Sequence, residues 1–177
     1  MAKMFEPKPC GCCAAPPLNE PRRRIIRIAA AGLAAPWTLA AAENNGPRRG
    51  DRLVEEDAEG SPAPLRVSDL EPGKPMLAFP FDAAKKEARN YSRLNKVVLL
   101  RFAEADLSAE NKARAAGGVL AFSAVCTHQA CDVKTWLAQE KVLVCFCHSS
   151  KFDLLDGAKV TTGPATRALP LLPLSLE

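Results

Sequence analysis

The chain of 177 residues contains only two histidines, and its other scarcities also restrict what the protein does. It has no Cys-x-x-Cys-His motif, which excludes covalent attachment of a c-type haem. It has no glycine-rich nucleotide loop and no Ser/His/Asp arrangement. Because both histidines belong to one motif, none is left for general-base catalysis. We therefore expect no substrate-converting site in this chain and assign no catalytic residue.

The chain has no surplus charge after residue 42, and it has no apolar run long enough for a comfortable membrane span. The chain carries 24 Lys and Arg against 20 Asp and Glu, and the excess of cations lies within residues 1–42. The balanced remainder offers no clustered basic surface, so we expect no nucleic-acid partner. A membrane span needs about 20 consecutive apolar residues, whereas residues 28–42 are fewer and include Pro36.

Residues 1–42 have the features of a targeting segment. Arg22 and Arg23 fit the pair of a twin-arginine signal, and the apolar residues Ile25 and Ile26 follow them. The small residues 40–42 suit cleavage before Glu43. This pattern predicts export of the folded protein to the periplasm. An uncleaved segment that tethers the protein to the membrane is the alternative.

Two short motifs bring cysteine and histidine together. Cys126-Thr127-His128 offers one Cys-x-His half-site, and Cys145-Phe146-Cys147-His148 offers a Cys-x-x-His half-site. Two thiolates and two imidazoles are what a Rieske [2Fe-2S] cluster requires, with the thiolates on one iron and the imidazoles on the other. Zinc also binds Cys₂His₂ sets with short spacings, so a zinc module remains open from these residues alone.

The other cysteines fall into two groups. Cys131 and Cys147 each lie close to a candidate ligand, so these two could form a disulfide, which the periplasm would preserve. Zinc would leave both unexplained. Cys10, Cys12 and Cys13 precede the arginine pair, and we expect them to leave with the signal segment.

The two motifs and their neighbours resemble a known family. Residues 126–131 and 145–153 are similar to the two cluster-binding loops of high-potential Rieske proteins, among them the iron-sulfur subunit of cytochrome bc complexes and the small subunit of arsenite oxidase. The resemblance implies a Cys131–Cys147 disulfide and a hydrogen bond from Ser150 to a bridging sulfide. Residues 163–166 resemble the proline loop that shields the cluster. The implied iron ligands are Cys126, His128, Cys145 and His148.

Several positions depart from the family's usual pattern. Ala130 and Ser149 replace glycines, and Phe146 replaces a proline, so the conformation of the loops and the docking surface are open to change. Phe152 occupies the place of a tyrosine that is usual in bc complexes. Phenylalanine there resembles the arsenite oxidase small subunit, which is the closest type that the sequence indicates.

Short β patterns recur from residue 75 onward and predict an all-β fold. A polar, proline-containing stretch at 43–69 predicts an extended N-terminal arm, and 106–116 predicts a short helical excursion at the surface. Asp153–Gly157 predicts a hairpin turn. The resemblance implies a Rieske-type antiparallel domain over 70–177, with base sheets and an inserted cluster-binding subdomain at about 123–165. The predicted strands are 76–81, 96–102, 118–125, 141–145, 151–154, 159–162 and 169–174.

Together these features predict an electron-transfer subunit of a periplasmic oxidoreductase. We expect it to pass electrons from a large catalytic subunit to a cytochrome c or a cupredoxin. The resemblance to the arsenite oxidase type implies that this large subunit contains molybdenum. The alternatives are a quinol-oxidising iron-sulfur subunit of a cytochrome bc complex and a free-standing Rieske carrier. Membrane contact is expected only if the signal segment is retained.

Overall fold

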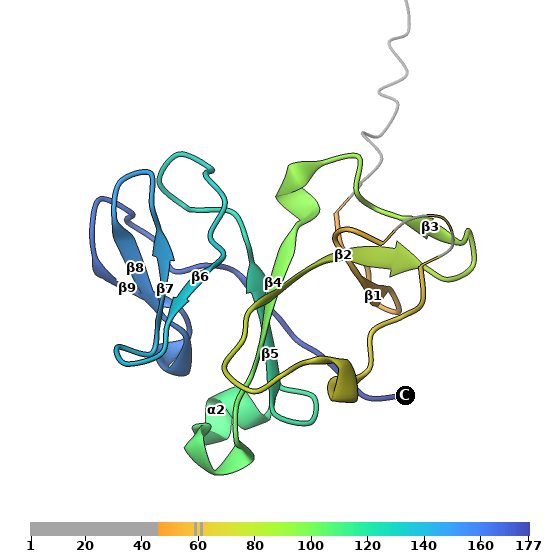
Figure 1. The fold of residues 1–177 in the computed structure, drawn as a ribbon, viewed down its shortest axis with the longest axis horizontal. Helices are drawn as coiled ribbons and strands as arrows, with labels where there is room; N and C mark the ends of the chain where they lie inside the picture. The colour runs from red at the N-terminus through yellow and green to blue at the C-terminus, as the bar shows by residue number, and fades with distance from the viewer. Residues whose placement is uncertain (1–45, 59, 61) are drawn as a thin grey trace, which may run out of the picture. The chain divides into compact units, whose positions relative to one another are not determined.

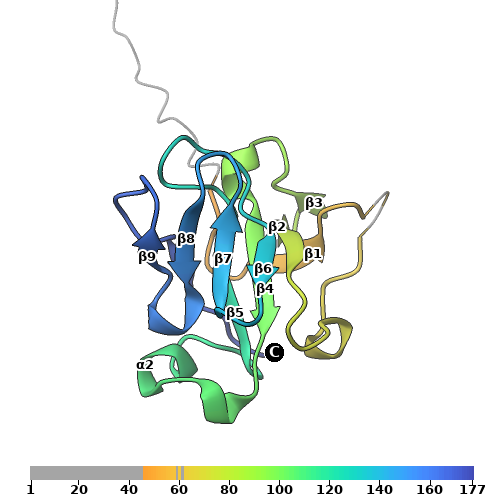
Figure 2. The same ribbon diagram turned by 60° about the vertical axis from the view of Figure 1, so that its left-hand side comes forward.

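The computed structural model describes residues 46–58, 60 and 62–177. The predicted twin-arginine segment and Cys10, Cys12 and Cys13 lie outside the described residues. Within them, strands form two antiparallel sheets, and the all-β prediction is confirmed (Figures 1 and 2). The described part of the chain contains no helix with the length and apolar character needed to cross a membrane.

The larger sheet is the base of the domain. Its order is β1-β2-β4-β5-β10, and β3 pairs with β2 to close a hairpin. All of its named pairs are antiparallel. Its strands are β1 (Arg52–Glu55), β2 (Met76–Asp82), β3 (Glu87–Ala88), β4 (Val97–Arg101), β5 (Val119–Ser123) and β10 (Leu171–Leu172).

The central strands β4 and β5 are continuous apolar runs because both faces of the base sheet are covered. In β4, Val98 and Leu100 join a core that extends into the second sheet. Val97 and Leu99 point into a separate core, which also includes Leu70. The first of the two candidate ligand loops, residues 126–131, therefore follows a strand that is fixed on both faces.

Strand β1 was not among the predicted strands, although it lies within the segment expected as an extended arm. Val54 is buried there, and Leu53 packs at the edge of the second core. The Leu65 N–H donates to the Leu53 carbonyl at 2.8 Å, which folds the chain back along β1. Two apolar residues between charged neighbours are too short a pattern to reveal a strand.

The smaller sheet is inserted between β5 and β10 and has the order β6-β7-β8-β9. Its strands are antiparallel, and β7 and β8 end and begin with the paired residues Cys145 and Ser150. Both ligand loops lie at one end of this sheet, above the tips of the strands in Figures 1 and 2. The strands are β6 (Thr135–Leu137), β7 (Val142–Cys145), β8 (Ser150–Asp153) and β9 (Lys159–Thr162).

Short helical turns connect the strands. The excursion predicted at 106–116 contains α2, whose residue Asn111 is buried and donates from Nδ2 to the Leu155 carbonyl at 2.8 Å. The hairpin predicted at 153–157 is present, with Asp153 accepting hydrogen bonds from the next turn. The predicted run 169–174 pairs only at β10. The turns are η1 (Val67–Asp69), η2 (Arg93–Asn95), η3 (Glu104–Asp106), α2 (Ala109–Lys112) and η4 (Leu154–Asp156).

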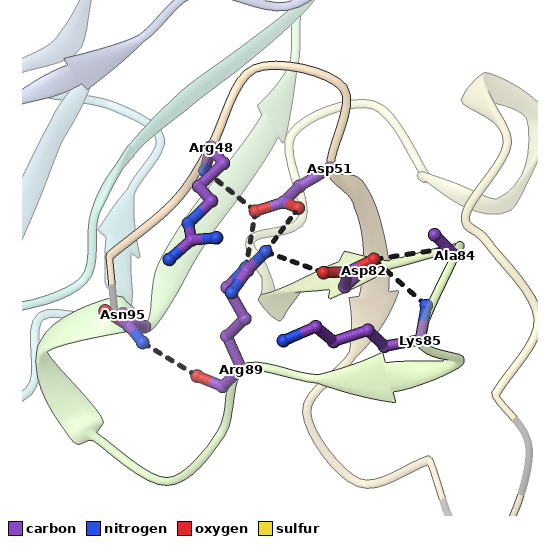
Figure 3. A network of polar contacts seen from close by, with 7 residues as sticks. All are labelled: Arg48, Asp51, Asp82, Ala84, Lys85, Arg89 and Asn95. Carbon is purple, nitrogen blue, oxygen red and sulfur yellow. Dashed lines mark hydrogen bonds and ion pairs between the residues drawn. The ribbon is translucent and has the colours of Figure 1, made fainter. Parts of the chain in front are cut away.

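A buried arginine ties the first described residues to the β2–β3 hairpin (Figure 3). Arg89 donates to both carboxylate oxygens of Asp51, from Nε at 2.8 Å and from Nη2 at 3.1 Å. The same Nη2 lies 3.0 Å from Asp82 Oδ2. Asn95 Nδ2 donates to the Arg89 carbonyl at 2.9 Å, so the network also reaches η2. Three separate segments are thereby held at one corner of the base.

The carboxyl group of Asp82 titrates below its ordinary range. The backbone N–H of Lys85 lowers the pKa of Asp82 most, burial opposes it, and the Ala84 N–H and the Arg89 guanidinium add to the lowering. A carboxyl whose pKa is depressed by folding stabilises the protein above its unfolded pKa. That stabilisation is lost as the pH falls through the folded pKa.

We therefore expect Asp82→Asn to lower the free energy of unfolding at pH 7. The difference from wild type should shrink below about pH 4, where Asp82 of the unfolded chain takes up a proton before Asp82 of the folded protein does. Urea unfolding at pH 7 and pH 3 measures it. Glu87→Gln, at an exposed position in β3, is the matched control and should show no such convergence. A difference for Asp82→Asn that stays constant between the two pH values would contradict the assignment.

Candidate metal centre

The first ligand loop joins β5 to β6 and is closed by its own backbone. Val125 and Asp132 form an antiparallel bridge at its base. The Cys126 N–H donates to the Cys131 carbonyl at 2.8 Å, and the Ala130 N–H donates to the Cys126 carbonyl at 2.9 Å. The loop is thus a compact unit whose first residue is a buried cysteine.

The second ligand loop joins β7 to β8. Cys145 is the last residue of β7 and lies opposite Ser150, the first residue of β8. Phe146 and His148 are exposed, whereas Cys145 and Ser150 are buried. The strand pair therefore buries the cysteine and presents the histidine at the tip.

The two loops are joined, as the resemblance implied. Cys131 and Cys147 form a disulfide with a Cα–Cα distance of 6.5 Å, which confirms that prediction. The imidazole rings of His128 and His148 lie with their centroids 4.7 Å apart and their planes at 88°. One histidine from each loop thus reaches the same place.

The two candidate cysteine ligands remain free thiols, with Cys126 4% and Cys145 1% exposed. Burial raises the pKa of the Cys145 thiol, the Cys147 N–H opposes the rise, and the neighbouring Cys126 thiol adds to it. The Cys145 sulfur also lies within 4.8 Å of both disulfide sulfurs. Because those sulfurs are bonded to each other, they do not compete for a metal, and Cys126 is the thiol partner that is left for Cys145.

The environment of one imidazole nitrogen beside the two loops shows whether the residues fit a cluster. His128 Nδ1 is buried and has no hydrogen-bond partner. A buried polar atom without a partner costs about 1–3 kcal/mol, so such an atom calls for an explanation. An iron ligated by this nitrogen would supply the missing partner. Two buried thiols, an unpartnered imidazole nitrogen and a second imidazole match the donor set of a Rieske [2Fe-2S] cluster.

The segment 163–167 contacts both ligand loops. The Ala165 N–H donates to Ser150 Oγ at 3.1 Å, which leaves the Ser150 hydroxyl proton free to donate elsewhere. Thr127 Oγ1 donates to the Arg167 carbonyl at 2.6 Å and joins the segment to the first loop. A Cβ on Gly163 would lie 2.5 Å from the Ser150 Cα, so glycine allows this close approach.

The replaced glycines keep a glycine-like backbone. Ala130 and Ser149 both have φ of 56°, in the left-handed region. An L-residue there costs roughly 1–2 kcal/mol. The departures that opened the loop conformation to change are therefore accommodated as local strain within the loops.

Three further residues hold the site and gave no sequence signal. Trp136 in β6 packs edge to face on Phe102 of the base at 5.6 Å. Asn111 links α2 to η4, and Lys96 forms ion pairs that connect the base to the first loop. Each contact joins residues far apart in the chain, so no local pattern indicates it. Phe152, at the position where bc complexes usually have a tyrosine, is fully buried in the core shared by the sheets.

The fold and the site together define an all-β protein with a two-cysteine, two-histidine [2Fe-2S] centre. Residues 66–173 match the Rieske [2Fe-2S] domain family, and the chain belongs to that family. Family membership answers the zinc alternative, because the cofactor of this domain is a [2Fe-2S] cluster. The arsenite oxidase type is not shown by the match.

Similar proteins carry the names of bc1 complex subunits and of a putative nitrate reductase subunit. The chain is 33% identical over 117 residues to the cytochrome bc1 complex Rieske iron-sulfur subunit of Streptomyces lividans, covering 64% of this chain and 69% of that one. It is 35% identical over 136 residues to a putative respiratory nitrate reductase subunit Rieske of Haloferax mediterranei, covering 76% and 57%. The bc1 subunit of Streptomyces coelicolor is 33% identical, and the match spans 33% of its length.

Glycine is expected to be the more stable residue at the two strained positions and at the crowded one. Ala130→Gly and Ser149→Gly should each raise the free energy of unfolding by roughly 0.5–1 kcal/mol, because relief of strain exceeds the entropy gained by the unfolded chain. Gly163→Ala should lower it by roughly 2–3 kcal/mol, since its φ is positive and its Cβ meets backbone atoms. Chemical denaturation measures all three.

Ala138→Gly, at an exposed position after β6, is the control for the effect of glycine on the unfolded chain. It should be neutral or slightly destabilising. Ala130→Gly behaving like this control would show that the left-handed conformation of the loop carries no strain.

Proposed function

We propose that Cys126 and Cys145 hold one iron of the cluster and that His128 and His148 hold the other. The observation that carries this assignment is the buried, unpartnered His128 Nδ1 at the end where the two free thiols meet. The Cys131–Cys147 bridge keeps the two loops together. Ser150 accepts from the Ala165 N–H and keeps its hydroxyl proton, which we expect it to donate to a sulfur of the cluster.

When bound, such a cluster exchanges one electron at a potential of roughly −150 to +300 mV, raised because two neutral imidazoles replace thiolates. The protein's own groups support that exchange. Burial of the cysteines keeps water from the sulfurs, and the segment 163–167 packs against the two ligand loops. His148 and Phe146 are exposed at the tip, and Phe146 is 73% exposed. This end is suited to contact with a redox partner.

The function that these features support best is electron transfer within an oxidoreductase complex. A large catalytic subunit would reduce the cluster, and a cytochrome c or a cupredoxin would accept the electron. The relatives support a place in a complex, since their names describe subunits of bc1 and nitrate reductase assemblies. Export to the periplasm by the twin-arginine route belongs to the same proposal and rests on Arg22 and Arg23.

Within that class we favour a large subunit of the arsenite oxidase kind, with molybdenum. Support comes from Phe152, at the place of the bc-type tyrosine, and from residues 163–166, which resemble the proline loop. The second candidate is a quinol-oxidising subunit of a cytochrome bc complex, which the names of the bc1 relatives favour. In that case the N-terminal segment would serve as a tether.

Isolation of the full chain from its own cells under mild conditions separates the two candidates. A large subunit that contains molybdenum would support the favoured one. Co-purification with cytochromes b and c1 would replace it with the bc complex, and neither partner would indicate a free-standing carrier.

The ligand assignment predicts a reduced protein with an iron-sulfur EPR signal whose mean g value is below that of the free electron. His128→Gln and Cys145→Ser should lose the signal and the iron, because each removes a proposed ligand. Gln129→Ala, at the exposed position next to His128 in the first loop, is the control and should keep both the signal and the iron. A colourless wild-type protein that holds zinc would refute the assignment.

A further inference from the structure

Lys96 connects the base of the domain to the first ligand loop. Its Nζ lies 2.6 Å from Glu56 Oε1, at the end of β1, and 2.9 Å from Asp132 Oδ2, at the stem of the loop. The Lys96 side chain is only 11% exposed. An ion pair at this depth is less screened by solvent than a surface pair.

The backbone of Lys96 contacts the same stem. The Ala124 N–H donates to the Lys96 carbonyl at 2.9 Å, and the Val133 N–H donates to the Ala124 carbonyl at 2.8 Å. The Val125–Asp132 bridge lies directly beyond these bonds. Lys96 therefore holds the stem through its main chain and its side chain together.

The ion pairs form a balanced group, called the loop-stem clamp below and made of Glu56, Arg93, Lys96 and Asp132. Arg93 Nη2 lies 3.7 Å from Asp132 Oδ1, so two cations face two carboxylates. Burial by itself would lower the pKa of Lys96, but the Glu56 and Asp132 carboxylates outweigh it and raise the pKa. The ammonium group of Lys96 is therefore charged.

The clamp is connected to the proposed centre from two directions. Asp132 follows Cys131, whose disulfide leads to Cys147 and its neighbour His148. Val125, the bridge partner of Asp132, precedes Cys126. In Figures 1 and 2 the turn before β4 lies beside the loop that precedes β6. The clamp is thus linked by short covalent and backbone connections to proposed ligands on both loops.

We propose that Lys96 is a positioning residue of the [2Fe-2S] centre, fixing the first ligand loop to the base and setting the cluster's midpoint potential through the charge balance of the loop-stem clamp. The inference rests on the proposed ligand set. Reduction adds one negative charge to the cluster, so an unbalanced carboxylate nearby disfavours it and an unbalanced cation favours it.

This charge rule predicts shifts of opposite sign. Lys96→Gln leaves the clamp with one excess negative charge and should lower the midpoint potential. Asp132→Asn leaves one excess positive charge and should raise it. The double variant restores the balance and should return the potential toward that of wild type. Voltammetry on the full chain loaded with its cluster measures all three.

Two matched variants make the test specific. Lys96→Arg keeps the cation and should keep the wild-type potential. Lys159→Gln removes a lysine that pairs with Asp156 in the turn at the far end of β8, and it should give no shift of the midpoint potential.

Arg93→Gln tests the charge rule at an exposed member of the clamp. It should lower the midpoint potential even if the Lys96→Gln variant does not hold iron.

The outcomes separate this inference from the proposed function. An unchanged EPR signal in the variants shows that the ligands are intact, and a wild-type protein without a [2Fe-2S] signal would refute the proposed function. Shifts of the same sign for Lys96→Gln and Asp132→Asn would indicate loosening of the loop without a charge effect and would overturn the inference. Potentials that match wild type in Lys96→Gln, Asp132→Asn and Arg93→Gln would overturn it as well.

Amide hydrogen exchange tests the positional half of the inference independently of the potential. The N–H groups of Cys126 and Ala130 should exchange faster in Lys96→Gln than in wild type, because their loop loses one anchor. In Lys96→Arg, which keeps the cation, these N–H groups should exchange as slowly as in wild type. Equal exchange in wild type and Lys96→Gln would show that the side chain does not hold the loop.

Discussion

The disulfide between Cys131 and Cys147 is the constraint on which the site depends. The first ligand loop joins the base sheet to the smaller sheet, the second joins two strands of the smaller sheet, and nothing local requires them to meet. The bridge fixes them to each other and thereby brings the imidazoles of His128 and His148 within 4.7 Å, measured between ring centroids. A cross-link of this kind removes conformational freedom that would otherwise oppose the assembly of a four-ligand site.

Packing then fixes this cross-linked end to the rest of the domain. Cys126 and Cys145 belong to the core that also contains Leu120 and Phe122 of β5, so the candidate ligands are part of the interior and not attached to its surface. The Trp136–Phe102 contact, the Asn111 hydrogen bond and the ion pairs of Lys96 add connections between the sheets. Since protein interiors are densely packed, displacement of one loop would have to disturb both sheets.

The sequence predicted β2, β4, β5, β7, β8 and β9 from short β patterns, and these strands lie where the patterns placed them. It did not predict β1, β3 and β6. Strands β3 and β6 have only two and three residues, and β1 has only two apolar residues between charged ones, so pairing with a neighbour decides all three. The loop residues that resemble the Rieske family are brought to one end as that resemblance implied, and the Cys131–Cys147 pairing is confirmed. The left-handed backbone of Ala130 and Ser149 is a further example of context overriding local preference, since neither residue favours that conformation.

By itself the sequence determined the chemistry of the site, because residue types decide which donor atoms exist and short spacings decide which of them lie in the same loop. Two thiols, two imidazoles and two further cysteines are local facts of this chain. Only the tertiary structure decided which cysteines bond to each other, that His128 Nδ1 is buried without a partner, and that Lys96 reaches both Glu56 and Asp132. These are relations between segments far apart in the chain, and burial and ion pairing depend on distances that no local pattern of residues contains.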